Sequence, residues 1–233
     1  TALYCKVMRL APESERDRLV LSKGHGCAAL YAVLAEVGYI DRKDLKTFCS
    51  VTGTLLGGHP ERRVRGIEAN TGSLGHGLPI SIGLALAAKM RAAKYRVFVV
   101  TGDGELQEGS NWEAAMAAAH FKLDNLVLIV DRNRLQLGGF TEELMSLEPL
   151  KDKWRSFGWV VRDIDGHDLE GLVELLSCVP FEEGKPSAVI AHTVKGKGVP
   201  CAENRVEWHY KVLTRDQYSE VAPVLGLRGL DDE

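Results

Sequence analysis

The sequence Gly102-Asp103-Gly104 follows one apolar run, and Asn133 follows the next one along the chain. Residues 96–100 and 126–130 have the length and branched apolar composition of buried strands. The alanine-rich stretch 113–121 between them predicts a helix. A strand, a crossover helix and a parallel strand bring the carboxyl ends of both strands to one edge of a sheet, where open α/β folds bind ligands.

Asp103 and Asn133 are therefore predicted to present a carboxylate and an amide oxygen to a common point. Hard oxygen ligands suit Mg²⁺, which takes few protein ligands and completes its octahedron with water and phosphate oxygens. The glycines on both sides of Asp103 let the backbone approach a diphosphate closely. Each residue alone could simply form a turn. Together they predict a site for Mg²⁺ and a diphosphate.

The rest of the pattern predicts an α/β fold with a mostly parallel sheet covered by helices on both faces, in three layers. One predicted helix, 79–90, is apolar on every face except at Ser81 and Lys89, so it is expected to be buried on all sides. Residues 52–68 read as a glycine-rich, charged loop. Further strands are expected at 19–22, 159–164 and 187–194, and further helices at 27–37, 42–48 and 169–177.

The amino-acid composition excludes several classes of function. Apolar residues make up 45% and charged residues 26% of the 233 residues, as in an ordinary globular protein. The net charge of −3 offers no basic field for nucleic acid or a membrane surface. The five cysteines form no CxxC pair, so neither a disulfide framework nor a zinc site is indicated. No apolar run has transmembrane length and no signal peptide is visible, so a cytoplasmic protein is expected.

The segment GDGELQEGSNWEAAMAAAHFKLDNLVLIVDRNRLQLGG resembles the thiamine diphosphate signature of transketolases. Five further motifs follow the family's order, and the resemblance covers nearly all of residues 1–213. They are RDRLVLSKGHG, GGHPE, NTGSLGHGLPISIGLALA, DGHD, and HTVKGKG with a later WH. The chain is most similar to the separate amino-terminal subunit of a split transketolase.

This resemblance implies a thiamine diphosphate-binding fold, with thiamine diphosphate and Mg²⁺ as cofactors and Ca²⁺ or Mn²⁺ as possible substitutes. The implied metal ligands are Asp103, Asn133 and the backbone carbonyl of Leu135. The implied cofactor-binding residues are His25, Gly72, Ser73, Leu74, Gly104, Glu105, Asn133 and His209.

The residues implied in catalysis are three histidines and one acid. His25 and His59 lie in glycine-bounded loops, and by resemblance they contact cofactor phosphate and ketose hydroxyls, where an imidazole can relay protons. His209 matches a family histidine near the diphosphate, although Tyr210 follows it where the family often has glycine. Glu108 could be a solvated first-turn glutamate. In the family this acid pairs with a glutamate of the neighbouring chain.

The implied reaction transfers a two-carbon ketol unit from a ketose or ketose phosphate to an aldose or aldose phosphate. The glutamate that activates the cofactor lies, in the family, on a following domain. A carboxyl-side partner subunit carrying a pyrimidine-binding domain is therefore expected, in a heterotetramer. Two alternatives stay open: a subunit of a 1-deoxy-xylulose-phosphate synthase-like or 2-oxo-acid decarboxylating thiamine enzyme, and a non-catalytic homologue.

Several features depart from the family pattern. His76 stands where full-length transketolases usually carry glutamine, and a structural role is expected for it. The chain opens on Thr1, and the family's upstream HPGG-type motif is absent, as in a fragment or a processed chain. Residues 1–233 are expected to form a single domain with a mobile tail at 224–233. The loop 195–198 is expected to cover the site.

Overall fold

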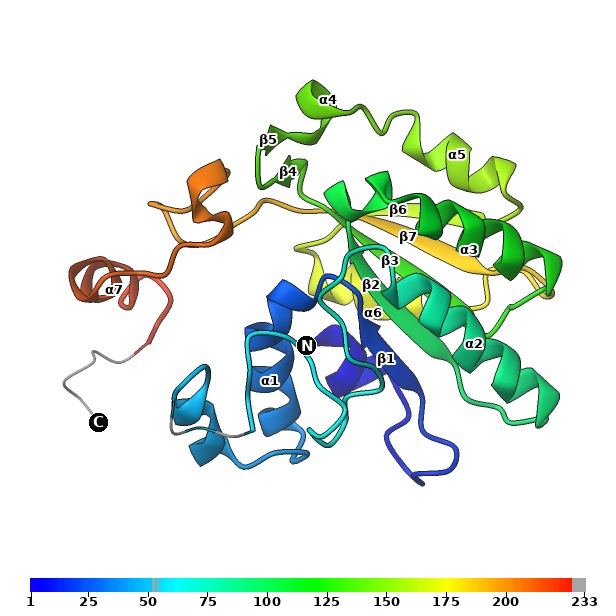
Figure 1. The fold of residues 1–233 in the computed structure, drawn as a ribbon, viewed down its shortest axis with the longest axis horizontal. Coiled ribbons are helices and arrows are strands. Elements are labelled where there is room, and N and C mark those ends of the chain that lie inside the picture. The colour runs from blue at the N-terminus through cyan, green and yellow to red at the C-terminus, as the bar shows by residue number, and fades with distance from the viewer. Residues whose placement is uncertain (52, 54, 228–233) are drawn as a thin grey trace.

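The computed structural model describes residues 1–51, 53 and 55–227. Its centre is a parallel five-stranded sheet with the strand order β1-β2-β3-β7-β6 (Figure 1). The strands are β1 (Arg18–Leu21), β2 (Val97–Gly102), β3 (Leu126–Arg132), β6 (Val160–Asp165) and β7 (Ser187–His192). The predicted α/β fold with a mostly parallel sheet is confirmed.

Helices cover both faces of this sheet because alternate strand residues point to opposite sides. Val97 and Val99 face a core that also contains side chains from α2 (Gly77–Met90), α3 (Gly109–His120) and α5 (Leu150–Ser156). Phe98, between them, faces a second core. That core is built with α1 (Cys27–Glu36), α6 (Leu169–Ser177) and the helical turn Leu3–Val7. Two apolar cores on one sheet make the three layers.

The pairing of β2 with β3 sets the geometry of the sheet edge. Gly102 lies opposite Asp131, so Asp103 follows beside the end of β3. The Asp103 amide donates to the Asp131 carbonyl at 3.2 Å, which extends the strand pairing by one residue. Asn133 follows β3 directly. Both residues thus leave the sheet at neighbouring points.

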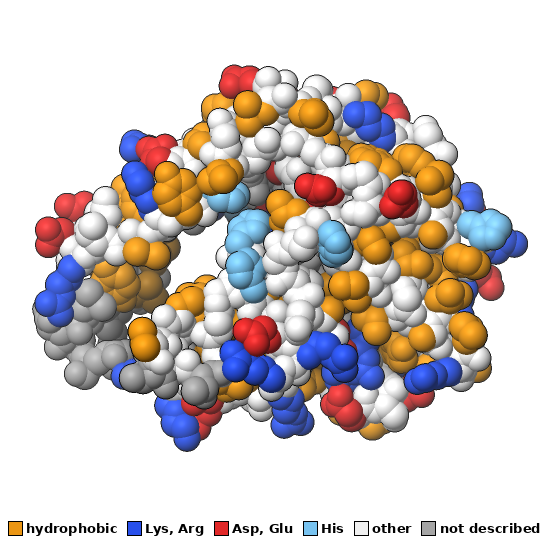
Figure 2. Space-filling model, viewed as in Figure 1, with side chains coloured by type: hydrophobic (Ala, Val, Ile, Leu, Met, Phe, Trp, Pro, Cys, Tyr) orange, Lys and Arg blue, Asp and Glu red, His pale blue; other side chains and the backbone are white. Residues whose placement is uncertain are grey.

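The prediction that the helix at 79–90 is buried on all sides is wrong for this chain. In α2, Leu78, Ile82 and Ala85 are buried, whereas Met90 is 80% exposed and Ile80 is also exposed. Figure 2 shows apolar side chains spread over the outer surface of α2 and α3. The apolar composition of α2 therefore reflects two apolar faces. One packs on the sheet, and the other has no partner within the described part of this chain.

Smaller differences concern the ends of elements. The helix expected at 113–121 begins at Gly109, and the segment expected as a helix at 42–48 is a 3₁₀ helix, Arg42–Thr47. The last expected strand ends at His192 rather than at residue 194. The elements that were not predicted include the hairpin of β4 (Leu135–Gln136) and β5 (Gly139–Phe140), and the helices α4 (Thr141–Leu144), α5 and α7 (Arg215–Val221).

The carboxyl-terminal arm leaves the sheet after β7 and carries α7 away from it (Figure 1). Within the tail expected to be mobile, Val224, Leu225 and Leu227 are exposed, and residues 228–233 lie outside the described residues. In the described part of the chain, no helix is both long and apolar enough to cross a bilayer.

Trp154 on α5 is fully buried, and its ring centroid lies 5.1 Å from those of both Trp112 and Trp159. We expect Trp154→Ala to lower the free energy of unfolding by about 3–5 kcal/mol, because a large cavity forms in the core above the sheet. The exposed Met90→Ala, as a control, should change it by less than about 0.5 kcal/mol. Urea unfolding of the protein measures both, and similar values for the two variants would contradict this packing.

Candidate functional site

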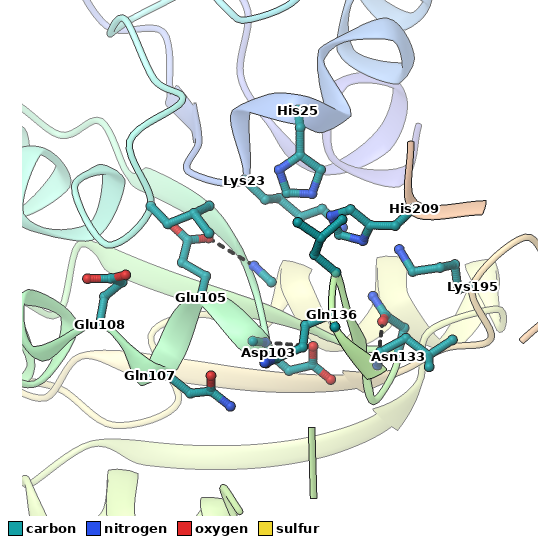
Figure 3. Close-up of a pocket in the computed structure, with 16 residues that line it drawn as sticks. Lys23, His25, Asp103, Glu105, Gln107, Glu108, Asn133, Gln136, Lys195 and His209 are labelled. Carbon is teal, nitrogen blue, oxygen red and sulfur yellow. Dashed lines mark hydrogen bonds between the residues drawn. The ribbon is translucent and has the colours of Figure 1, made fainter. Parts of the chain in front are cut away.

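A cavity of about 320 Å³ opens at the carboxyl edge of the sheet, above the ends of β2 and β3. Four cationic or potentially cationic side chains lie along one side of it: Lys23, His25, Lys195 and His209 (Figure 3). Asp103 lies apart from these side chains in this view, and Asn133 lies between Lys195 and Asp103. Figure 2 shows histidine side chains gathered around an opening between the body of the molecule and the carboxyl-terminal arm.

Asp103 is 1% exposed and is held by three donors. Its Oδ1 accepts the Gly104 N–H at 2.7 Å. Its Oδ2 accepts the Arg134 N–H at 2.5 Å and an Arg132 guanidinium N–H at 3.1 Å. Burial raises the pKa of Asp103, and these donors act in the opposite direction. The carboxylate is thus fixed in orientation and poorly solvated, which favours binding a cation.

Asn133 and Leu135 complete the oxygen-rich wall of the cavity, and both line it. The Asn133 side chain is 7% exposed, and its Oδ1 accepts the Leu135 N–H at 3.0 Å. Leu135 is 3% exposed and begins β4. The structure therefore places all three predicted metal ligands around one cavity, and their role as ligands stays a prediction.

Glu105 lines the cavity, but its carboxylate is engaged in holding the site together. Oε1 accepts the Ser22 hydroxyl at 2.5 Å and the Gly75 N–H at 2.9 Å, and Oε2 accepts the Gly102 N–H at 3.0 Å. Ser22 also accepts the Gly77 N–H at 3.1 Å, where α2 begins. A side chain at Gly77 would overlap Ser22, since an added Cβ would lie 2.4 Å from the Ser22 Cβ. The Glu105 carboxylate therefore has a structural role here, and the predicted contact of Gly104 and Glu105 with a cofactor stays a prediction.

The cationic side of the cavity is built from distant segments. Lys23 follows β1 and pairs with Asp131 at 2.7 Å, and this contact helps to hold the pKa of Asp131 low although burial would raise it. Burial and the nearby Lys23 lower the pKa of Lys195. Lys195 belongs to the loop expected to cover the site. The arrangement places two ammonium groups, one of them paired with Asp131, where an anion with several oxygens would bind.

The imidazole rings of His25 and His209 lie close together among these residues, with ring centroids 5.1 Å apart. Burial, then Lys23, His209 and Lys195, lower the pKa of His25 to about 4. Burial and the same two lysines lower the pKa of His209. Both imidazoles are therefore neutral at pH 7. The buried Nδ1 of His209 has no hydrogen-bond partner in the described part of the chain, so it is available to a ligand.

The other predicted residues lie at the rim. His59 is exposed and packs against Gly72, where an added Cβ would lie 2.8 Å from the imidazole; this close approach and the φ of +147° both require glycine. His59 is near enough to His25 to contribute to its lowered pKa. Leu74 lines the cavity, and neither Gly72, Ser73 nor His59 is among its lining residues.

Glu108 also lines the cavity and is exposed. It lies away from the cationic side chains in Figure 3. The predicted pairing with an acid of a neighbouring chain remains untested. His76 precedes α2 and its Nδ1 lies 3.0 Å from the Leu74 carbonyl oxygen, an arrangement that fits the structural role expected for it.

Sequence reasoning assigned no role to Lys23 and Gln136, which line the cavity, or to Arg132, which lies behind Asp103, and it expected Lys195 only as part of a loop over the site. Lys23 and Lys195 were visible as the lysines of SKGHG and KGKG beside glycines, a combination that often contacts anions. The buried Oε1 of Gln136 has no hydrogen-bond partner among the described residues. Nothing in the sequence marked Gln136 or Arg132.

The residues present fit a diphosphate held with a divalent cation. Cationic and neutral nitrogen donors line the same cavity as hard oxygens, and two buried polar atoms, Gln136 Oε1 and His209 Nδ1, have no hydrogen-bond partner among the described residues. Among the described residues, no three His, Cys, Asp or Glu side chains form a metal-binding group. One carboxylate with amide and carbonyl oxygens suits Mg²⁺ that shares its shell with phosphate.

Comparison with known proteins identifies the family. Residues 1–231 match the family model described as transketolase, thiamine diphosphate binding domain. The chain belongs to the transketolase family. Among its relatives, one of the subunits of the apulose-4-phosphate transketolase of Phocaeicola vulgatus is 49% identical, over 94% of this chain and 79% of that protein. The 6-deoxy-6-sulfo-D-fructose transketolase subunit SqwG of Clostridium sp. is 42% identical, over 98% of this chain and 84% of that protein.

Solved transketolases share the fold. The transketolase from Campylobacter jejuni superposes with a TM-score of 0.90 at 32% identity and covers 98% of this chain. The transketolase from Leishmania mexicana gives a TM-score of 0.87 at 32% identity and covers 93%. This chain spans 37% and 34% of those two chains, so it corresponds to one part of a transketolase of that length.

The lowered pKa of His25 can be measured directly. We expect its imidazole to titrate near pH 4 in the cofactor-free protein, followed by NMR of the ring C–H signals. His209→Ala should raise this pKa, because it opens the site to water and so weakens the burial that is the largest cause of the shift. His120→Ala, at the far end of α3, should leave it unchanged.

The same shift has a consequence for stability. The folded-state pKa of His25 lies below the value of 6.5 of an exposed histidine, so protonation favours the unfolded chain. Its contribution to stability is complete above pH 6.5 and is lost as the pH falls toward 4. Titration of His25 near pH 6.5 in the folded protein would contradict the geometry of this cationic cluster.

Proposed function

We propose that this chain is the amino-terminal, cofactor-binding subunit of a split transketolase that uses thiamine diphosphate and Mg²⁺. The reaction moves a two-carbon ketol unit from a ketose to an aldose. The observation that carries the proposal is that Asp103 and Asn133 line the same cavity as four side chains that can bind phosphate, Lys23, His25, Lys195 and His209.

Each element of the cavity has a task in this function. Asp103, Asn133 and the Leu135 carbonyl hold the metal, and Lys23 and Lys195 neutralise the diphosphate. When bound, thiamine diphosphate supplies the carbanion chemistry that breaks and forms the carbon–carbon bond. His25 is uncharged at neutral pH, so its ring can accept or donate a hydrogen bond to a substrate hydroxyl or pass a proton on.

A partner subunit completes the site in this proposal. Relatives of similar length are themselves named as subunits of transketolases, which supports a division between two polypeptides. The exposed apolar surface of α2 and α3, with Ile80, Met90 and Met116, is available for such a partner. Glu108 lies at the exposed rim, where an acid from another chain could approach. We propose a heterotetramer of two such pairs.

The substrates are proposed as ketoses and aldoses, with or without phosphate. The relatives' names include a ketose phosphate and a sulfonated deoxyketose, so both classes belong in a substrate panel. The transketolase relatives and the shared GGHPE and WH motifs favour sugar transfer over the alternative of a 2-oxo-acid decarboxylating enzyme.

The metal role of Asp103 is tested by Asp103→Ala, with Asp103→Asn as the closer isostere. We expect both variants to lose Mg²⁺-dependent thiamine diphosphate binding by at least about a hundredfold, because removal of a charged ligand costs about 3 kcal/mol or more. Calorimetry on the full-length subunit with its partner measures this. Asp152→Asn, whose side chain is exposed on α5, is the control and should bind normally. Unchanged binding by the Asp103 variants would instead favour a non-catalytic homologue.

The division of labour is tested by turnover. Without its partner, the full-length subunit should show no ketol transfer, because the activating glutamate is proposed to lie on that partner. Adding the carboxyl-side subunit should restore transfer, with a maximum at equal molar amounts. Assays follow aldose release from the ketose panel. Turnover in the absence of the partner would refute the split.

A further inference from the structure

Arg132 is a fully buried arginine at the end of β3, which contacts Asp103 in the cavity wall but is not itself among the lining residues. Its guanidinium contacts three carboxylates: Asp103 at 3.1 Å, Glu142 at 2.6 Å and Glu148 at 2.9 Å. It also donates to the Thr141 hydroxyl at 2.8 Å. Its side chain is 1% exposed, whereas those of Glu142 and Glu148 are 35% and 52% exposed. The guanidinium thus reaches from a surface acid pair to the buried carboxylate.

The contact with Asp103 leaves little of that carboxylate free. A carboxylate offers about four lone-pair directions, two on each oxygen. Oδ2 uses both of its own, one for the Arg134 N–H and one for the Arg132 guanidinium. Oδ1 uses one for the Gly104 N–H. One direction, on Oδ1, is left for a metal ion.

We propose that Arg132 sets the ion preference of this site by occupying Oδ2 of Asp103, so that only Oδ1 can bind the metal. This inference rests on the proposed metal site. Mg²⁺ requires a near-ideal octahedron, which single-oxygen ligands supply. Ca²⁺ accepts more ligands and readily takes both oxygens of one carboxylate. Blocking Oδ2 therefore favours Mg²⁺, and Arg132 acts as a positioning residue.

Two simpler roles for Arg132 make different predictions. If Arg132 only stabilised the fold, its loss would lower stability and would weaken the binding of both ions alike. If it acted only through its positive charge, its loss would strengthen the binding of both ions alike. The ratio of the Mg²⁺ and Ca²⁺ dissociation constants changes only if Arg132 selects the ion, so this ratio distinguishes ion selection from the two simpler roles.

The test compares Mg²⁺ and Ca²⁺ titrations of the full-length subunit with its partner in the presence of thiamine diphosphate, read by calorimetry. In Arg132→Met, a straight apolar chain fills the space without donating, and the two glutamates can still reach water. We expect the preference to move toward Ca²⁺ by about tenfold relative to the wild-type protein. The control Glu148→Gln removes a charge from the same cluster but leaves Arg132 on Asp103, so the ratio should not change.

The outcomes are distinct. No binding of either ion by the wild-type protein would overturn both the metal site and this inference. Binding of both ions with an unchanged ratio in Arg132→Met would overturn the inference alone. Should that variant not fold, a crystal structure of the wild-type complex with Ca²⁺ and thiamine diphosphate decides: Ca²⁺ bound through Oδ1 alone supports the inference, and Ca²⁺ bound by both oxygens of Asp103 overturns it.

Discussion

The site depends on the parallel pairing of β2 with β3, in which Gly102 lies opposite Asp131. This register places Asp103 beside the end of β3 and the start of the β4–β5 hairpin. A shift by one residue would turn every side chain of the strand to the other face of the sheet. Both apolar cores of the protein resist such a shift, because Val97 and Phe98 belong to opposite layers. The packing of the sheet therefore fixes the geometry of the candidate metal site.

The cavity brings charges of both signs together. Lys23 and Lys195 line it with their ammonium groups, Lys23 being paired with Asp131, and Asp103 contributes a buried negative charge. His25 and His209 stay neutral because burial and the lysines disfavour a further proton. An anion held with a divalent cation would interact with both kinds of charge, although the residues that carry them come from segments far apart in the chain.

Most of this fold can be predicted from the sequence, because apolar strands and alanine-rich helices leave strong periodic patterns. The meeting of Asp103 and Asn133 at one edge is predicted too, since that placement follows from parallel strands. The positions of short elements such as β4 and α4 cannot be predicted from the sequence, because tertiary contacts determine where they begin and end. Arg132 is missed as well, because a charged residue at the end of a strand reads as solvent-exposed. Two of its three partner acids, Glu142 and Glu148, lie in a later segment whose path has no sequence signature. The exposed face of α2 could not be predicted either. Its apolar residues are equally compatible with burial inside one chain and with burial at an interface between two chains.

The most direct test of the central claim is to locate the metal itself. Crystals of the full-length subunit with its partner, grown with Mn²⁺ and thiamine diphosphate, would give an anomalous scattering peak at the ion. The account predicts one peak in contact with Asp103, Asn133 and the Leu135 carbonyl, next to the diphosphate. A diphosphate bound in the cavity with the Mn²⁺ peak elsewhere, or with no peak, would contradict it.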